Sequence, residues 1–452
     1  MSTGRNGQQA AADEGAKGSS AAPRSNNLAV LHTPDQELRD KVIPVGSGIC
    51  VGRSAGTGVD VAINDRLLSR RHATIRPVGS SAICELVDHD SSNGSFVEGA
   101  RVTRSHMACG TIIRLGVTLL ELTSDGATEL EREAVDDTRD PFIGRSGTFR
   151  AVLSQIGAIA SGDKPVVFVG ETGTGKKRAA KRLHEASNRD GGFVVVHCGS
   201  THSQMTEAKL FGGVEPSDEM TTISEGFVPM AEGGSLLLHE VDLLTPKLQE
   251  VILHLLESGD YTQPGTGKTR HANVRIIASS GANLEAAVDA GAFSRELHHK
   301  LAACCIELPS LRSRRSDIPR LARHFLKVEA PTRQFDWSAT CLEKLLLYDW
   351  PMNVRELQTV MRRLTLVEDD VTTLRSAHLP KEIRKRTRQQ TEDELRASAI
   401  TVHAVPSREE LARLLDKFGG DVERIADYYA KDRRHIYRWL TRHDLSAADF
   451  RK

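Results

Sequence analysis

A short glycine-rich segment constrains the fold of this chain more than any other feature. It follows an apolar run at residues 166–169, leads into a helical pattern through His184, and reads Gly170-Glu171-Thr172-Gly173-Thr174-Gly175-Lys176. Glycines let backbone amides turn toward a phosphate, a helix N-terminus adds a favourable dipole, and the lysine can reach the terminal phosphates of a nucleotide. We therefore predict a strand, a nucleotide-binding loop and a helix. Residues 265–269 end like such a loop but lack its first glycine and a preceding strand, so no phosphate site is predicted there.

The pattern of apolar runs divides the chain into several domains, as its 452 residues lead us to expect. Short β-like runs without helical periods indicate a β-sandwich, whereas apolar runs alternating with helices indicate a parallel sheet covered on both faces. The predicted order is a disordered tail (1–27), a β-sandwich (28–125), an acidic linker (126–140), an α/β nucleotide-binding subdomain (141–315), a helical subdomain (316–380), a polar linker (381–406) and an all-α domain (407–452).

Composition narrows the functional classes. Lysine plus arginine and aspartate plus glutamate number 60 each, so a DNA-binding surface has to be local. The seven cysteines form no Cys-x-x-Cys pair, which is typical of buried thiols in a reducing compartment. No apolar run reaches the roughly 20 residues of a membrane helix, and no signal peptide is evident. We expect a soluble, cytoplasmic protein with no membrane partner. His298 and His299 lack an accompanying ligand cluster, so no metal site is predicted there.

Six segments in order carry a resemblance to a known domain. They are residues 142–146 (Phe-Ile-Gly-Arg-Ser), the glycine-rich loop, 210–212 (Leu-Phe-Gly), 233–238 (Gly-Gly-Ser-Leu-Leu-Leu), 308–318 (Leu-Pro-Ser-Leu-Arg-Ser-Arg-Arg-Ser-Asp-Ile) and 350–357 (Trp-Pro-Met-Asn-Val-Arg-Glu-Leu). Over residues 141–380 the chain resembles the AAA+ domain of sigma-54-dependent transcriptional activators. The resemblance implies ATP and Mg²⁺ as ligands, a homo-oligomer, and sigma-54 RNA polymerase as a partner.

The same resemblance implies roles for individual residues. Residues 170–177, from Gly170 to Lys177, would surround the nucleotide phosphates, and Arg355 would sense the nucleotide from the helical subdomain. His239 stands at the position of the magnesium-binding aspartate, and Glu240 would polarise the attacking water.

The chain departs from the family pattern at the metal and sensor positions. Lys177 replaces the Ser or Thr that follows the lysine in the generic loop, and His239 replaces an aspartate, although magnesium prefers hard oxygen ligands. Ser280 and Gly281 replace the polar Thr-Asn sensor. These changes put magnesium binding and hydrolysis in doubt.

Two further departures concern partners of the AAA+ domain. Residues 216–221, Pro-Ser-Asp-Glu-Met-Thr, replace the sigma-contacting loop Gly-Ala-Phe-Thr-Gly-Ala and have no aromatic tip. Ser294 and Lys300 stand at the arginine-finger positions, and Arg295 is the candidate substitute. Two hypotheses therefore stay open: an ATP-hydrolysing activator with compensating residues, or a sigma-54-independent, DNA-bound scaffold that binds nucleotide but hydrolyses it slowly or not at all.

Three motifs in the first domain resemble the forkhead-associated (FHA) domain, a β-sandwich that binds phosphothreonine. They are residues 52–54 (Gly-Arg-Ser), 69–73 (Ser-Arg-Arg-His-Ala) and 91–97 (Ser-Ser-Asn-Gly-Ser-Phe-Val). By position Arg53, Ser69 and Arg70 would hold the phosphate, Ser92 and Asn93 the peptide backbone, and His72 and Gly94 would support the loops. Glu98, where the family often has Asn, weakens the prediction of peptide selectivity. The alternative is a sandwich whose loops only pack against the neighbouring domain.

The C-terminal helices resemble the factor-for-inversion-stimulation type of helix-turn-helix. Leu411, Leu414 and Leu415 recur at helical spacing before Gly419 and Gly420, and Val422, Ile425 and Ala426 lie on a second short helix. In the last helix Ile436, Trp439 and Leu440 can pack inward, which leaves a basic face of Arg433, Arg434, His435, Tyr437 and Arg438. We predict that this face binds DNA, with its N-terminal residues at base edges and its later basic residues at phosphates.

Overall fold

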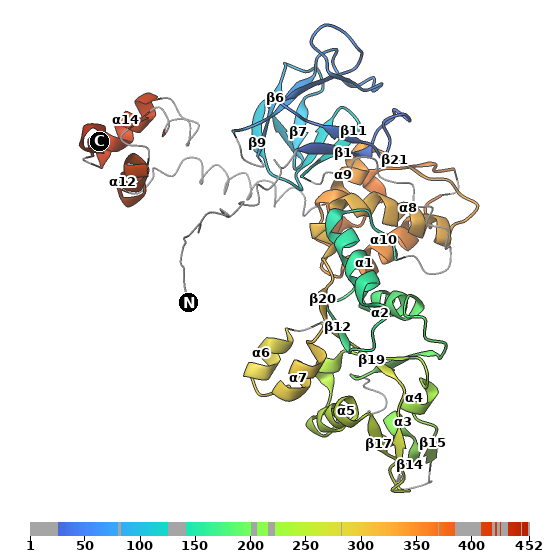
Figure 1. Ribbon diagram of the computed structural model, residues 1–452. Helices are drawn as coiled ribbons and strands as arrows, with labels where there is room; N and C mark the ends of the chain where they lie inside the picture. Colours follow the sequence, from blue (N-terminus) through green and yellow to red (C-terminus); the bar gives the residue numbers. More distant parts are fainter. Residues whose placement is uncertain are drawn as a thin grey trace, which may run out of the picture. The chain divides into compact units, whose positions relative to one another are not determined.

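The computed structural model describes residues 26–79, 83–124, 142–199, 206–215, 222–281, 283–368, 370–384, 408–417, 421–422, 425, 433–443 and 445–450. The chain forms two compact units, residues 1–380 and 381–452, and each is described by itself (Figure 1). Among the described residues, no helix is long and apolar enough to cross a membrane.

The first domain is the predicted β-sandwich. One sheet has the strand order β2-β1-β11-β10-β7-β8 and the other β4-β3-β5-β6-β9. Their apolar inner faces meet in one core that includes Leu28, Ile63, Ile75, Leu86 and Ile113, all fully buried. The strands are β1 (Asn27–His32), β2 (Val42–Pro44), β3 (Ile49–Gly52), β4 (Val61–Ala62), β5 (Ala73–Pro77), β6 (Cys84–Asp88), β7 (Ser95–Val97), β8 (Ala100–Val102), β9 (Arg104–Met107), β10 (Ile112–Leu115) and β11 (Thr118–Thr123).

The α/β subdomain contains a five-stranded parallel sheet in the order β13-β16-β19-β12-β20. Its strands are β12 (Val166–Val169), β13 (Phe193–His197), β16 (Ser235–His239), β19 (Arg275–Ser280) and β20 (Cys305–Glu307), and its helices are α1 (Gly147–Ile159), α2 (Lys176–Glu185), α3 (Glu207–Phe211), α4 (Phe227–Met230), α5 (Pro246–Ser258), α6 (Leu284–Asp289) and α7 (Arg295–Leu301). Two hairpins, β14 (Gly213–Glu215) with β15 (Thr222–Ser224) and β17 (Asp260–Thr262) with β18 (Thr269–His271), extend from it.

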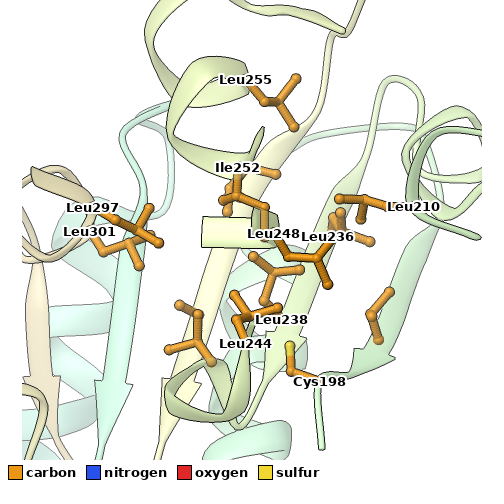
Figure 2. Close-up of a cluster of buried hydrophobic side chains, with 14 of the residues drawn as sticks. Cys198, Leu210, Leu236, Leu238, Leu244, Leu248, Ile252, Leu255, Leu297 and Leu301 are labelled. Carbon is orange, nitrogen blue, oxygen red and sulfur yellow. The ribbon is translucent and has the colours of Figure 1, made fainter. Parts of the chain in front are cut away.

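Alternate residues of β16, an interior strand between β13 and β19, face the two layers of helices. Leu237 packs with α1 and α2 on one face of the sheet. Leu236 and Leu238 pack on the other face, where Figure 2 shows them beside Leu248 and Ile252 of α5. All three β16 leucines are buried, which is why the strand reads as a continuous apolar run in the sequence.

The helical subdomain consists mainly of α8 (Ile318–Glu329), α9 (Ala339–Leu347) and α10 (Asn353–Leu364). The short turns η1 (Val241–Leu243), η2 (Leu311–Ser313), η3 (Arg315–Asp317) and η4 (Ser376–His378) and the strand pair β21 (Asp336–Trp337) with β22 (Thr373–Leu374) complete the first unit. Trp350 lies between α9 and α10 with no exposed surface, and its Nε1 donates a hydrogen bond to the Leu345 carbonyl at 2.8 Å. This tryptophan therefore ties the two helices together.

The sandwich docks on the helical subdomain through a shielded ion pair. Arg114 Nε of β10 donates to Glu343 Oε2 of α9 at 2.9 Å, and their side chains are only 14% and 10% exposed. The Arg114 guanidinium stacks over the Phe96 ring, with 3.7 Å between Cζ and the ring centroid. Burial raises the pKa of Glu343, and the Coulombic attraction of Arg114 opposes this shift. This contact joins the sandwich and the helical subdomain, which the sequence predicts as separate domains, within one compact unit.

The second unit has a small helical core. Its described elements are α12 (Arg408–Lys417), α14 (Arg433–Arg442) and η5 (Ala447–Phe450). Leu411, Leu415, Val422, Ile436 and Leu440 are buried together, with Trp439 packed against them. The inward packing predicted for the last helix is confirmed.

Three expectations need correction. Strand β1 begins at Asn27, the last residue of the predicted tail, because its backbone already pairs with Thr123 and Pro44. A short strand, β17, does precede residues 265–269, but these residues form the turn of a hairpin and no helix follows. The thiols are not uniformly buried, since Cys109 and Cys305 are exposed. The acidic linker predicted at 126–140 lies outside the described residues.

Replacing the buried tryptophan should destabilise the helical subdomain. We expect Trp350→Ala to lower the free energy of unfolding by about 3–5 kcal/mol, because it leaves a large cavity and an unpaired Leu345 carbonyl. Denaturant titration followed by circular dichroism measures the change. Leu366→Ala is the control, since that side chain is 82% exposed and should change stability by less than about 0.5 kcal/mol. Equal stability of both variants would contradict this assignment.

Candidate nucleotide and phosphopeptide sites

The glycine-rich loop adopts the predicted strand-loop-helix geometry between β12 and α2. Gly173 and Gly175 have φ of 80° and 106°, a region that residues with side chains rarely adopt. Lys176 begins α2, is 6% exposed, and donates from Nζ to the carbonyls of Gly170 at 2.6 Å and Glu171 at 3.0 Å. The ammonium therefore lies folded onto its own loop, and burial lowers its pKa.

The helical subdomain holds the loop in place. A Cβ on Gly173 would come within 2.0 Å of the Met352 carbonyl oxygen, so only glycine allows this contact. Val354 N donates to the Gly173 carbonyl at 3.0 Å. Buried Asn353 donates from Nδ2 to Glu171 Oε2 at 3.1 Å and to the Thr172 carbonyl at 3.0 Å.

Two arginines strengthen this connection. Arg312 Nη1 donates to Glu171 Oε2 at 2.8 Å, and its hydrogen bonds are the main cause that lowers the pKa of Glu171. Buried Arg314 Nη2 donates to the Thr174 carbonyl at 3.1 Å. These contacts join the loop to the segment that leads into the helical subdomain, and Arg355 in the first turn of α10 lines the pocket.

A pocket of about 480 Å³ opens beside the loop. Its lining carries many more cationic than anionic side chains: Lys176, Lys177, Arg178, Lys181 and Arg355 against the carboxylate of Glu240, with His197 and His239 also present. Such a basic recess suits a polyanionic ligand. The structure thus brings together eight of the residues predicted from the sequence: Thr172, Gly173, Gly175, Lys176, Lys177, His239, Glu240 and Arg355.

His239 ends β16 at the rim of this pocket. Its Nδ1 lies 2.6 Å from Ser279 Oγ of β19, and its ring meets that of His197 edge-on at 5.0 Å between centroids. Burial lowers the pKa of His239, the negative charge of Glu240 opposes this shift, and His197, Lys176 and Lys177 reinforce it. A neutral imidazole thus occupies the strand end where the family pattern has a carboxylate.

The neighbouring predicted residues are placed differently. Glu240 lines the pocket with a backbone φ of 62°, immediately before η1. Ser280 Oγ donates to Asp242 Oδ1 at 2.7 Å, while Gly281 lines the pocket. Arg295 is 79% exposed at the start of α7, where it pairs with Asp289 at 3.8 Å, and it is not among the residues of this pocket. Its role as a finger across a subunit interface stays a prediction.

The predicted sigma-contact segment and the histidine pair of α7 are not among the described residues that line this pocket. Residues 216–221, the predicted sigma-contact segment, fall outside the described residues, and only the flanking strands β14 and β15 are seen. His298 and His299 lie on α7. In the part of the chain that the structure describes, no group of three or more His, Cys, Asp or Glu side chains could hold a metal ion.

In the sandwich, the predicted phosphopeptide residues converge on one set of loops. Arg53 N donates to the Ser69 carbonyl at 3.0 Å, Ser92 N donates to Ser69 Oγ at 3.1 Å, and Asn93 Nδ2 donates to the Leu67 carbonyl at 2.7 Å. Arg53, Arg70, Ser92 and Asn93 are exposed. The loops therefore present two guanidinium groups and polar donors to solvent.

A buried histidine fixes these loops. Ser69 N donates to His72 Nδ1 at 3.1 Å, so Nε2 carries the proton and donates to the Gly94 carbonyl at 3.3 Å. The ring has no exposed surface, and burial lowers its pKa, which keeps it neutral. His72 thus has the supporting role that the sequence predicted.

Glu98 lies in the turn between β7 and β8. Its Oε1 accepts from Ile112 N at 2.7 Å, and its Oε2 accepts from Arg315 Nη1 of η3 at 2.8 Å. The weaker peptide selectivity expected from Glu98 stays a prediction, whereas the structure shows that this carboxylate connects the sandwich to the AAA+ region. The connection went undetected because nothing local in the sequence pairs residues 98 and 315.

In the second unit, α14 carries the predicted DNA-binding residues. Tyr437 and Arg438 are exposed on the side opposite buried Ile436 and Leu440. The helix also includes Arg433, Arg434 and His435, as predicted. The backbone places all five on one helix of ten residues, a length suited to a groove of DNA.

Comparisons with known proteins agree with this architecture. Family models described as an FHA domain, a Sigma-54 interaction domain and an AAA+ ATPase lid domain match residues 49–116, 142–307 and 312–396. The chain is 30% identical over 336 residues to the transcriptional regulatory protein GlrR of Escherichia coli (strain K12), covering 73% of this chain and 74% of that protein. It is 34% identical over 235 residues to a Nif-specific regulatory protein of Rhizobium leguminosarum bv. trifolii, covering 51% and 67%.

Other relatives match over shorter shares of their length. The DNA-binding transcriptional regulator NtrC of Rhizobium meliloti (strain 1021) is 34% identical over 247 residues, which cover 53% of this chain and 51% of that protein. The chain likewise covers 46% of the phenol regulator MopR of Acinetobacter guillouiae. The chain thus spans about half the length of these two curated relatives.

Removing the Arg53 guanidinium should abolish phosphopeptide binding and leave the fold of the sandwich intact. We expect Arg53→Ala to abolish measurable binding of a phosphothreonine peptide, because a charge-assisted hydrogen bond to phosphate is lost from an exposed loop. A library of phosphothreonine peptides, read by fluorescence anisotropy, supplies the measurement. Arg76→Ala is the control, since Arg76 pairs with Glu85 at the far end of β5. Undiminished binding by Arg53→Ala would show that the phosphate is held elsewhere.

Proposed function

Because this chain belongs to the family of sigma-54-dependent transcriptional activators, we propose that it is a DNA-bound regulator that reads a phosphothreonine protein and binds ATP. The observation that carries the proposal is the coexistence of three cation-bearing surfaces in one chain. They are the exposed loops of the sandwich, the basic pocket beside the glycine-rich loop, and helix α14. Each surface suits a phosphate-containing ligand of a different kind.

The first surface supports a sensor role. The sandwich docks on the helical subdomain through Arg114 and Glu343 and through Glu98 and Arg315, whereas Arg53 and Arg70 remain exposed. This arrangement argues against the alternative in which the loops only pack on the neighbouring domain. The phosphothreonine-containing partner would bind there without displacing the docking contacts.

The second surface supports ATP binding. The loop geometry, the position of Lys176 at the start of α2 and the basic lining are those expected around a triphosphate. Arg355 reaches the same pocket from α10, so the ligand would bridge the two subdomains. Self-association into a homo-oligomer follows from the family, and Arg295 is exposed as a residue acting on a neighbouring subunit would be.

A second candidate function is favoured by one observation, the imidazole of His239. In it the chain is a DNA-bound scaffold that binds ATP but hydrolyses it slowly or not at all. Glu240 is present, yet the strand end that would carry a magnesium-binding carboxylate holds a neutral ring bonded to Ser279. The sequence at 216–221 also lacks an aromatic tip, so contact with sigma-54 RNA polymerase would be altered or lost.

The third surface gives the most direct test of the regulator proposal. Selection from a random DNA pool with the whole protein should enrich a paired half-site, and Arg438→Ala should weaken binding to the enriched DNA. Because Arg438 is assigned to a phosphate, the slope of log affinity against log salt should fall by about 1 for each copy of the chain that is bound.

The matched control is Arg408→Ala, which removes an exposed arginine from α12 of the same unit. Its affinity and salt slope should equal those of the wild type. If selection enriches no sequence, or if both variants lose the same affinity, α14 is not the DNA-binding surface.

A further inference from the structure

We propose that the pocket beside the glycine-rich loop binds ATP without a divalent metal, and that the ammonium of Lys177 supplies the countercharge that Mg²⁺ would supply. This inference rests on the proposed binding of ATP and goes beyond it by naming the metal-free triphosphate as the ligand.

The donor set does not fit magnesium. Mg²⁺ takes oxygen ligands in a near-octahedral arrangement. In the generic loop, one such oxygen comes from a Ser or Thr hydroxyl directly after the lysine, and this position holds Lys177. A second comes from a carboxylate at the strand end, and this position holds His239, whose Nδ1 is 2.6 Å from Ser279 Oγ. Nitrogen groups thus replace oxygen ligands at both positions.

Nearby oxygen groups are already engaged. Thr174 Oγ1 donates to the Glu171 carbonyl at 2.8 Å, and Asp242 accepts from Ser280 Oγ at 2.7 Å. Glu240 is the carboxylate among the described lining residues. Mg²⁺ is bound through one or two carboxylates together with substrate phosphates, and of these the described pocket lining offers Glu240 and lacks the carboxylate at the strand end.

The charge of the pocket favours the free anion. Five cationic side chains line it, including Lys176 and Lys177 in the first turn of α2 and Arg355 from α10. Lys177 is exposed and lines the same pocket as His239, the residue at the strand end where the metal would be held. A dication placed there would be repelled by Lys177, whereas a triphosphate would be attracted.

The replacements at 177 and 239 therefore complement each other. With His239 alone, the pocket would lose the metal and gain no cation to neutralise the triphosphate. With Lys177 alone, the ammonium would face a carboxylate at the end of the strand. Together they exchange a carboxylate and a metal for an imidazole and an ammonium, and the pocket remains suited to the same polyanion.

The test is ATP binding by the full-length protein, measured by isothermal titration calorimetry in EDTA and in Mg²⁺. We expect the wild-type Kd in EDTA to lie within about twofold of that in Mg²⁺, or below it. Lys177→Ala should weaken binding in EDTA by about tenfold. The control Lys268→Ala removes an exposed lysine from the β17–β18 turn and should change neither value.

The double variant Lys177→Ser, His239→Asp restores both oxygen ligands. Its binding should become at least about tenfold tighter in Mg²⁺ than in EDTA. Wild-type binding that requires Mg²⁺, or equal loss from Lys177→Ala and Lys268→Ala, would overturn the metal-free inference alone. Failure of the wild type to bind ATP in either buffer would instead overturn the proposed ATP binding itself.

Discussion

The contact between the glycine-rich loop and α10 is the constraint on which the rest of the AAA+ region depends. Asn353 is buried and has a backbone φ of 51°. Its Nδ2 donates to Glu171 and Thr172 of the loop, and its Oδ1 accepts from the Leu311 amide. Gly173 makes this close approach possible. Because the loop and the helical subdomain share these bonds, a ligand in the pocket acts on both. The sandwich, which docks on α9 through Arg114, is connected to the same body.

Against this intact scaffold, the changed chemistry is confined to a few side chains. Lys176, Glu240 and Arg355 line the pocket as the family pattern requires, whereas His239 and Lys177 alter the charge and ligand type at the metal position. Such a distribution is expected when binding of a phosphate ligand is kept and the metal-dependent step is relaxed. Nucleotide would then act through assembly and domain coupling, and the phosphothreonine signal would enter through the sandwich.

The sequence predicted the fold where local patterns are strong. The apolar run of β16, the glycine-rich loop and the motifs around Arg53 and His72 each have a local physical reason that can be read from the chain. What it could not predict depends on pairs far apart, such as Glu98 with Arg315 and Arg114 with Glu343. The pairing of Glu98 with Arg315 was not predicted for this reason, since the position of Glu98 in a family motif says nothing about its partner. The histidine pair at 197 and 239 was likewise hidden, because only strand pairing brings these residues together.

The central claim is that the AAA+ domain is a nucleotide-binding element whose metal-dependent hydrolysis has been disabled at the strand end. Phosphate release from ATP, measured with Mg²⁺ at protein concentrations high enough for assembly, tests it most directly, with the wild type compared to the double variant Lys177→Ser, His239→Asp. The account predicts no magnesium-stimulated turnover by the wild type and its recovery in the variant. Robust wild-type turnover that Mg²⁺ stimulates would contradict the account and show that other residues compensate for His239.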